Sequence, residues 1–401
     1  HVPRTTFVVL GTFFIFIRKK AGKIMTKTIK DLAHYDIVGS FLRPEELKKA
    51  RKDFSEGKIS QDELKEIEDR LIDELVEKEK EVGLKAVTDG EFNRGWWHID
   101  FLENLDGVEG YVPQTGYNQQ FKGTDAPAYN VRVVGKVKFN PNHPFLKNFS
   151  YLKEVADKRN LIAKATIPSP TMLYRQEILA NDGSSKLKEI YPNIEEFYAD
   201  LSQTYADAIK AFYDLGCRYL QFDDTNWAFL VDKNKREALL EKGIDPNEAT
   251  KISKKIINNA LANKPDDLII TTHVCRGNHA SSWLFSGGYE AVAEDLFATD
   301  YDGYFLEFDD ARSGSFEPLR FVPAGKRVVL GLVTSKKPEL EDKDELKQKI
   351  QEATKYVDLD DLALSTQCGF ASTEEGNKLT EKDQENKLKL VIETAKEVWG
   401  D

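Results

Sequence analysis

Short runs of apolar residues recur along the chain and alternate with longer segments of helical periodicity. The runs are nearly continuous, which is typical of strands that are buried on both faces of a parallel sheet. We expect eight such strands, over residues 35–40, 84–90, 160–170, 218–224, 268–275, 303–310, 327–335 and 362–369. Helical patterns lie between them, for example over residues 44–82, 194–216, 247–264 and 343–357. Strands alternating with helices in this number predict an α/β fold of the (β/α)₈ TIM barrel type.

The carboxyl ends of the predicted strands are polar, and in a barrel of this kind the chemistry lies at that rim. All eight ends have hydroxyl, carboxyl, imidazole or thiol groups: Ser40, Asp89 with Glu91, Ser169, Asp223 with Asp224, His273 with Cys275, Glu307, Ser335 and Cys368. A doubly wound open sheet is the alternative, but it gives no reason for every end to be polar. The pattern therefore favours a barrel with one site on its rim.

A long stretch without a barrel strand separates the second predicted strand from the third. We expect residues 95–159 to be an insertion, because a loop of this length in a compact domain is usually a lid or a binding element. Within it, residues 128–139 alternate between apolar and polar positions, as in a β-hairpin. No repeat or low-complexity linker divides the chain, so residues 25–401 are predicted to form a single barrel domain.

The first 24 residues differ from the rest of the chain. An apolar run, Phe7–Ile17, precedes a basic stretch and then Met25. This run is too short to cross a bilayer, which takes about 20 residues, and no small-residue cleavage site follows it. We expect residues 1–24 to be a non-native or disordered extension, with a membrane anchor or signal peptide as the alternative.

Composition restricts the class of protein. Hydrophobic residues make up 40% and charged residues 31% of the 401 residues, as in soluble globular proteins, and the formal net charge is −11. An acidic chain is a poor ligand for nucleic acid, which needs clustered Lys and Arg. We therefore expect no nucleic-acid partner, and no membrane partner either. Three cysteines make a disulfide framework unlikely, so we expect a cytoplasmic protein. Small molecules are the expected partners, and an oligomer is compatible with these data.

Three residues far apart in the chain have the side chains of one metal site. His273 and Cys275 are two apart on a predicted strand, so their side chains point to the same face. Cys368 ends another strand, and Glu307, at the end of a third, is the best candidate for a fourth ligand of tetrahedral Zn²⁺. The alternative is a buried polar pair of His273 and Cys275. Cys217 has no such neighbours, and we expect it to be a small buried residue.

A zinc site of this type predicts alkyl transfer. Zinc stabilises the deprotonated form of a coordinating thiol. A substrate thiol in an exchangeable position is therefore a nucleophile at neutral pH, and thiolates attack carbon well. A hydrolase with zinc-bound water is less favoured, because two thiolate ligands make zinc a poorer Lewis acid.

Six short motifs point to one known family. They are VGSF, VTDGEFNR, LQFDD, THVC, FLEF and STQCG, spread from about Tyr35 to the C-terminus. Together they resemble the catalytic barrel of cobalamin-independent methionine synthase, and most of all its short single-barrel relatives. The resemblance implies a (β/α)₈ fold and a zinc ion that activates homocysteine for methylation to methionine. It implies zinc ligands at His273, Cys275, Glu307 and Cys368, and homocysteine contacts at Val38, Gly39, Ser40, Glu91 and Asp223.

The chemistry of an amino acid supports these substrate contacts independently. Carboxylates bind an α-ammonium group, and Glu91 and Asp223 supply two of them, so we take this pair as the catalytic carboxylates. The hydroxyl of Ser40 and the neighbouring backbone can donate to an α-carboxylate. The alternatives are an ion pair of Glu91 with Arg94, and capping of the next helix by Asp223.

Two features depart from the family pattern. Full-length members have a second barrel that helps to hold polyglutamyl folate, and this chain has room for one barrel. They also have a His after the seventh strand, where this chain has Ser335 and Lys336. That His can protonate the departing folate nitrogen, and a weak nitrogen leaving group needs an acid.

By resemblance we expect 5-methyltetrahydrofolate (polyglutamate) as donor. The alternatives are a methylcorrinoid or another small molecule as donor, another thiol as acceptor, or a non-catalytic protein that binds zinc and homocysteine.

Overall fold

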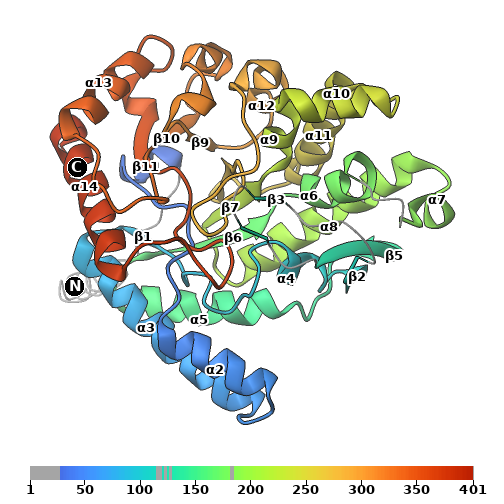
Figure 1. Cartoon of the computed structure of the whole chain (residues 1–401), viewed down its shortest axis with the longest axis horizontal. Coiled ribbons are helices and arrows are strands. Elements are labelled where there is room, and N and C mark those ends of the chain that lie inside the picture. Colours follow the sequence, from blue (N-terminus) through green and yellow to red (C-terminus); the bar gives the residue numbers. More distant parts are fainter. Residues whose placement is uncertain (1–27, 114–119, 122–123, 126–128, 181–184, 401) are drawn as a thin grey trace, which may run out of the picture.

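The structure, a computed structural model, describes residues 28–113, 120–121, 124–125, 129–180 and 185–400. Residues 1–24, which were expected to be an extension, lie outside these ranges. Parallel strands form one curled sheet with helices around it (Figure 1). In sheet order they are β1 (Ala86–Val87), β6 (Ile162–Pro168), β7 (Tyr219–Asp224), β8 (Ile269–Val274), β9 (Gly303–Glu307), β10 (Arg327–Val333) and β11 (Leu362–Thr366). Each pairs in parallel with its neighbours, which confirms the predicted α/β barrel.

The first expected strand, residues 35–40, closes the barrel without forming a regular ladder. Tyr35 forms a single parallel bridge to Leu364 of β11. Beyond it, three consecutive carbonyls accept hydrogen bonds from buried side chains: Ile37 from Lys164, Val38 from Gln221 and Gly39 from Thr88. The expectation of eight strands is therefore corrected, for the described residues, to seven strands in the sheet and one extended segment. Side chains replace the partner strand there, and apolar patterning does not reveal this.

The outer layer consists of amphipathic helices. The long ones are α2 (Glu45–Ser55), α3 (Gln61–Val82), α5 (Pro144–Lys158), α8 (Ile194–Asp214), α11 (Pro246–Leu261), α13 (Lys343–Ala353) and α14 (Glu381–Trp399). Shorter ones are α6 (Thr171–Tyr174), α7 (Leu187–Ile190), α9 (Asn226–Val231), α10 (Lys233–Glu241) and α12 (Ala293–Phe297). The ends of α3 follow from its sequence, since Ser60 and Glu63 cap each other at the start and Gly83 adopts the left-handed conformation at the end. Among the described helices, none is long and apolar enough to cross a membrane.

The region expected to be an insertion, residues 95–159, has two structural parts. The first contains α4 (Ile99–Leu102), the antiparallel pair β2 (Asp106–Tyr111) and β5 (Asn130–Lys138), and the short pair β3 (Gln120–Phe121) and β4 (Thr124–Asp125). The hairpin expected over residues 128–139 is therefore wrong, since β5 is one long strand whose partner is β2. The second part is α5, which packs against α3 and β6 in the outer layer. A role of the first part as a lid stays a prediction.

Candidate metal and substrate site

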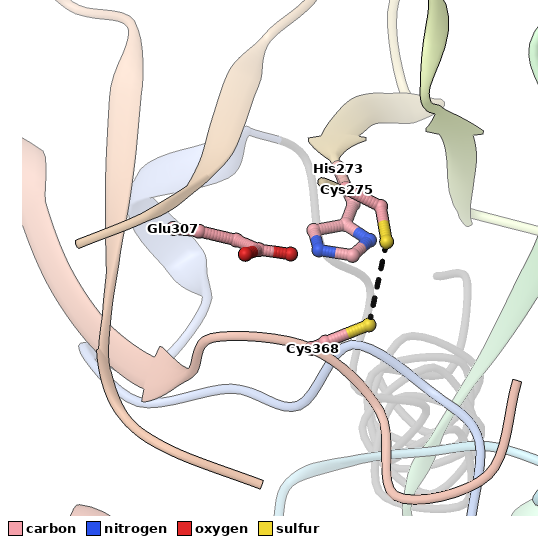
Figure 2. Close-up of side chains that lie close together, drawn as sticks. All are labelled: His273, Cys275, Glu307 and Cys368. Atoms are coloured by element: carbon pink, nitrogen blue, oxygen red, sulfur yellow. Dashed lines mark hydrogen bonds between the residues drawn. The ribbon is translucent and has the colours of Figure 1, made fainter. Parts of the chain in front are cut away.

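Four side chains meet at the carboxyl ends of β8, β9 and β11 (Figure 2). They are His273 and Cys275 at the end of β8, Glu307 at the end of β9, and Cys368 just after β11. Their potential ligand atoms all lie within 4.8 Å of one another. Each residue is at most 6% exposed. The structure thus brings together the four residues that were predicted to bind metal.

Strand register explains why residues so distant in the chain converge. In the parallel pairing of β8 with β9, His273 lies opposite Phe305. Two residues further along, Cys275 and Glu307 are level with each other, and their side chains point to the same face as that of His273. Closure of the barrel brings Cys368 to the same point from β11.

The geometry of the four side chains suits zinc. Sγ of Cys275 and Sγ of Cys368 are 3.6 Å apart. Two thiolates bound at ~2.3 Å to a tetrahedral zinc would be separated by ~3.8 Å. Oε1 of Glu307 accepts a hydrogen bond from the backbone N–H of Arg276 at 3.1 Å, whereas Oε2 is buried without a hydrogen-bond partner. A buried carboxylate oxygen that lacks a donor, next to two thiols and an imidazole, fits a cation.

The pKa values of these four groups are shifted in different directions. The hydrogen bond between the two thiols lowers the pKa of Cys368 and raises that of Cys275 well above its usual value. Burial raises the pKa of Glu307. Burial also acts to lower the pKa of His273, but its hydrogen bond to Asp223 and the charge of Cys368 outweigh this and raise the pKa to about 9. A metal has to displace these protons, so its affinity should increase with pH.

A small cavity adjoins this cluster and contains most of the predicted substrate residues. Its lining consists of Val38, Ser40, Glu91, Trp97, Asp223, His273, Cys275, Cys368, Gly369 and Ser372. Gly39 does not line it, but a Cβ at that position would lie 2.9 Å from Cγ2 of Thr166. A larger groove between α3 and α14 contains none of the candidate residues.

Glu91 is held in an unusual conformation. Its φ of 61° is in the left-handed region, which costs a non-glycine residue roughly 1–3 kcal/mol and occurs mainly at functional sites. Oε1 lies 3.4 Å from Nη1 of Arg94, so the ion pair considered as an alternative is present. Oε2, however, is buried without a partner. Burial raises the pKa of Glu91 to about 7, although Arg94 and Arg43 act to lower it.

The adjacent residues Asp223 and Asp224 have different contacts. Asp224 accepts a hydrogen bond from the backbone N–H of Asn226 at 2.7 Å and so fixes the start of α9. Asp223 lines the cavity, where its Oδ1 lies 3.3 Å from Nδ1 of His273 and accepts a hydrogen bond from Gln221 at 2.7 Å. Asp223 therefore touches a candidate metal ligand, a contact that the sequence did not reveal.

Gly369 is a site residue that sequence reasoning missed. A Cβ at this position would lie 2.0 Å from Oγ of Ser40 and 3.0 Å from its backbone nitrogen. Ser40 is fixed in turn, since its Oγ accepts a hydrogen bond from the backbone N–H of Ala371 at 3.3 Å. Only glycine permits this approach of the two loops. The glycine directly after Cys368 was the signal that could have revealed it.

Two loops pair above the cavity. Trp97 donates a backbone hydrogen bond to the carbonyl of Ser372 at 3.2 Å, and Glu374 donates one to Gly95 at 3.1 Å. Between these bonds, Trp96 and Thr373 form an antiparallel bridge. We call residues 95–97 and 372–374 the roof, because Trp97 and Ser372 line the cavity beneath them.

The fold and the site match one family. Residues 188–397 match the profile of the cobalamin-independent synthase catalytic domain, which is about half of the chain. The chain belongs to the cobalamin-independent methionine synthase family. The resemblance noted in its motifs is thereby confirmed, and its activity is of the methyltransferase kind.

Individual members of the family are similar over different lengths. Protein YxjH of Bacillus subtilis (strain 168) is 49% identical, over 94% of this chain and 98% of its own. A solved structure from Listeria monocytogenes, named as a candidate vitamin-B12 independent methionine synthase, is 42% identical with a TM-score of 0.73, and the match covers 92% of this chain and 99% of that one. The 5-methyltetrahydropteroyltriglutamate–homocysteine methyltransferase of Bacillus cereus (strain AH187) is 22% identical over 83% of this chain, a match that covers 39% of that protein.

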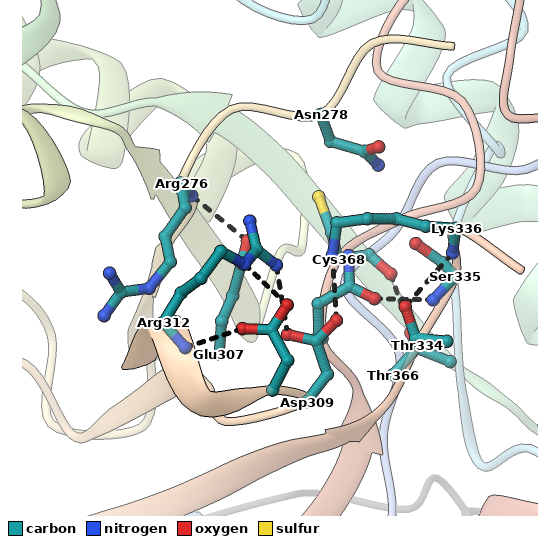
Figure 3. Close-up of polar contacts among 12 residues, drawn as sticks. Arg276, Asn278, Glu307, Asp309, Arg312, Thr334, Ser335, Lys336, Thr366 and Cys368 are labelled. Atoms are coloured by element: carbon teal, nitrogen blue, oxygen red, sulfur yellow. Dashed lines mark hydrogen bonds and ion pairs between the residues drawn. The ribbon is translucent and has the colours of Figure 1, made fainter. Parts of the chain in front are cut away.

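Ser335 and Lys336, which follow β10 where a family histidine was expected, are part of a buried polar network (Figure 3). Nζ of Lys336 lies 2.9 Å from Oδ2 of Asp309, and Nη2 of Arg312 lies 3.8 Å from Oδ1. The hydroxyl of Ser335 donates a hydrogen bond to the carbonyl of Gly369 at 2.9 Å. Neither Ser335 nor Lys336 is among the residues that line the cavity.

Proposed function

We propose that the protein is a zinc-dependent methyltransferase that methylates the thiol of homocysteine to form methionine. The observation that supports this most is one cavity in which three of the four candidate metal ligands, His273, Cys275 and Cys368, lie beside Glu91 and Asp223, with Glu307 next to them in the buried cluster. His273, Cys275, Glu307 and Cys368 would hold Zn²⁺, which keeps a substrate thiol deprotonated at neutral pH when it is bound.

The amino-acid part of the substrate fits the remaining lining. Glu91 has an unpaired buried oxygen that would accept from the α-ammonium group, and Asp223 would be the second carboxylate. Ser40 and the backbone of Val38 and Gly39 would bind the α-carboxylate. This arrangement directs the substrate thiol toward the cysteines, because the ammonium and sulfur ends of homocysteine are recognised by different groups.

Methyl transfer would be a single displacement. The substrate sulfur forms a bond to the methyl carbon while the bond from that carbon to the donor breaks. We propose 5-methyltetrahydrofolate in its polyglutamate form as the donor, by family membership. A second cavity, which shares Trp97 with the first and is also lined by Trp96, His98 and Arg175, offers aromatic faces to a flat ring. The leaving nitrogen takes up one proton, which balances the proton that the thiol releases when it becomes a thiolate.

We propose that the protein is a metabolic enzyme of the cytoplasm that acts on small molecules. Its partners would be homocysteine and the methyl donor. All three cysteines are buried free thiols, which agrees with a reducing cytoplasm.

A donor panel tests this function. Purified protein with homocysteine would receive 5-methyltetrahydrofolate with one glutamate, the same donor with three glutamates, or methylcobalamin. We expect about one zinc per chain and methionine formation with at least one donor. Homocysteine binding without methionine from any donor would indicate a non-catalytic binding protein. Zinc-dependent methylation of other thiols but not of homocysteine would indicate a different acceptor.

A further inference from the structure

Arg43 is a buried cation with an unusual set of partners. Arg43 follows the extended segment 35–40 in the chain, and it is 3% exposed. Its guanidinium donates hydrogen bonds to four backbone carbonyls: Phe41 at 3.0 Å, Ala371 at 2.6 Å, Glu91 at 2.8 Å and Arg94 at 3.4 Å. No ion pair of the described residues includes Arg43, so the hydrogen-bond partners of its guanidinium are peptide carbonyls, while the charge of Glu91 acts on it from nearby. A charge is rarely buried in this way unless its geometry is needed.

The four carbonyls belong to three separate loops at the rim of the barrel. Each loop contributes to the candidate site, with Ser40 in the first, Glu91 in the second and Cys368 in the third. Direct hydrogen bonds also join these loops in pairs: Phe41 N–H to the Gly90 carbonyl, Phe370 N–H to the Ser40 carbonyl, and the two bonds of the roof, but none of these bonds joins all three loops. Arg43 is therefore a common attachment point for the amino-acid half of the cavity and the loop of Cys368.

The turn that contains Glu91 needs such an attachment. A non-glycine residue with φ of 61° keeps that conformation only where its surroundings fix it. Arg43 binds the carbonyl of Glu91 itself. Arg51 binds the turn from outside, at the carbonyls of Phe92 and Arg94, but it does not reach Glu91 or Ala371.

We propose that Arg43 is a positioning residue for amino-acid recognition: it fixes the Glu91 turn against the loops of Ser40 and Cys368. This inference rests on the proposed function. Arg43 does not line the cavity, so it acts through Glu91 rather than on the substrate. Its positive charge also favours the ionised form of Glu91, the form that binds ammonium. The metal ligands on β8 and β9 are outside its reach and should be unaffected.

Arg43→Lys tests this role, because lysine keeps the charge and loses the planar fork that serves three loops. In the zinc-loaded protein we expect homocysteine to bind about tenfold more weakly, equivalent to one lost charge-assisted hydrogen bond. KM for homocysteine should rise more than kcat falls, and zinc affinity should fall by less than homocysteine affinity, because Arg43 reaches the loop of only one of the four candidate ligands, Cys368. Amide hydrogen exchange should become faster in residues 88–95 and 368–374 only. Arg51→Lys is the matched control, with homocysteine affinity close to wild type.

The outcomes separate this inference from the function on which it rests. If wild-type protein binds no homocysteine, the proposed function fails, and this role of Arg43 fails with it. If wild type binds homocysteine and Arg43→Lys binds it equally well, only the role of Arg43 is wrong. A parallel loss of zinc, homocysteine binding and melting temperature in Arg43→Lys would make Arg43 a general structural residue and would also overturn the proposal.

Discussion

The two halves of the cavity are built in different ways. The metal half consists mainly of residues at the ends of regular strands, where parallel register pairs Val274 with Leu306, the residues directly before Cys275 and Glu307. The amino-acid half consists mainly of Ser40, at the end of an extended segment outside the ladder, and Glu91, which follows a strand of two residues, while Asp223 at the end of β7 lies between the two halves. There, buried side chains bind backbone carbonyls and replace the missing ladder.

This difference has a physical consequence. Backbone ladders fix many residues cooperatively, so loss of one side chain from the metal half should remove a ligand and leave the strands in place. The amino-acid half depends on individual side chains such as Arg43 and Gln221, each fully buried. Substitution of such a residue should change the geometry of the cavity without removing any group that touches the substrate. Four substitutions test the comparison.

Cys368→Ser should have the largest effect, because it removes a thiolate from the metal half. We expect zinc affinity to fall by more than about 100-fold, the upper range for loss of an outer-shell partner, and methyl transfer to disappear. Metal analysis after dialysis against a chelator measures this. Cys217→Ala is the matched control, since Cys217 is buried away from the cluster, and it should keep its zinc. Full zinc content in Cys368→Ser would contradict the ligand assignment.

Glu91→Gln should damage the amino-acid half and leave the metal half intact. Loss of a charge-assisted hydrogen bond should weaken methionine or homocysteine binding by about 10–100-fold, with zinc unchanged. In the wild type the pKa of Glu91 is about 7 in the free protein, where burial raises it. The carboxylate must be ionised to bind ammonium, so affinity should increase with pH up to about 7 and then level off. Calorimetry with methionine, which has no thiol to titrate, should show this dependence in wild type and none in Glu91→Gln.

Asp223→Asn should affect both halves, because Asp223 lines the cavity and contacts His273. A carboxylate that orients a metal-binding histidine is typically worth 10-fold or more in metal affinity. We expect zinc and homocysteine each to bind about tenfold more weakly. Asp224→Asn is the control; it should lower the melting temperature, since Asp224 fixes α9, without changing either affinity. A variant of Asp223 that loses only homocysteine would show that the contact with His273 has no influence on the metal.

Gly369→Ala should have the smallest effect of the four. The added methyl group would lie 2.0 Å from Oγ of Ser40, and overpacking of this kind costs about 1–3 kcal/mol. We expect a lower melting temperature and severalfold weaker homocysteine binding, with zinc retained. Gly135→Ala on β5 is a suitable control, because its nearest neighbour would be 3.4 Å away. Unchanged binding in Gly369→Ala would mean that Ser40 can move without loss of function.

The sequence predicted how the four candidate metal ligands are grouped better than it predicted the structure around Ser40 and Glu91, for the same physical reason. Strand periodicity places His273 and Cys275 on one face, and the other two candidate ligands end strands of the same sheet, so patterning was sufficient to group them. Residues 35–40 have the apolar composition of a strand, but their partners are side chains from distant positions, which no local pattern encodes. The contact of Asp223 with His273 depends likewise on tertiary packing.

The roof over the cavity has a consequence for the speed of the reaction cycle. Its two backbone hydrogen bonds join residues 95–97 to residues 372–374, and Trp97 and Ser372 both line the cavity. We expect a small molecule to exchange faster when these two bonds break, because they hold together two loops that line the cavity. The rate at which the roof opens would then limit turnover independently of the chemistry beneath it.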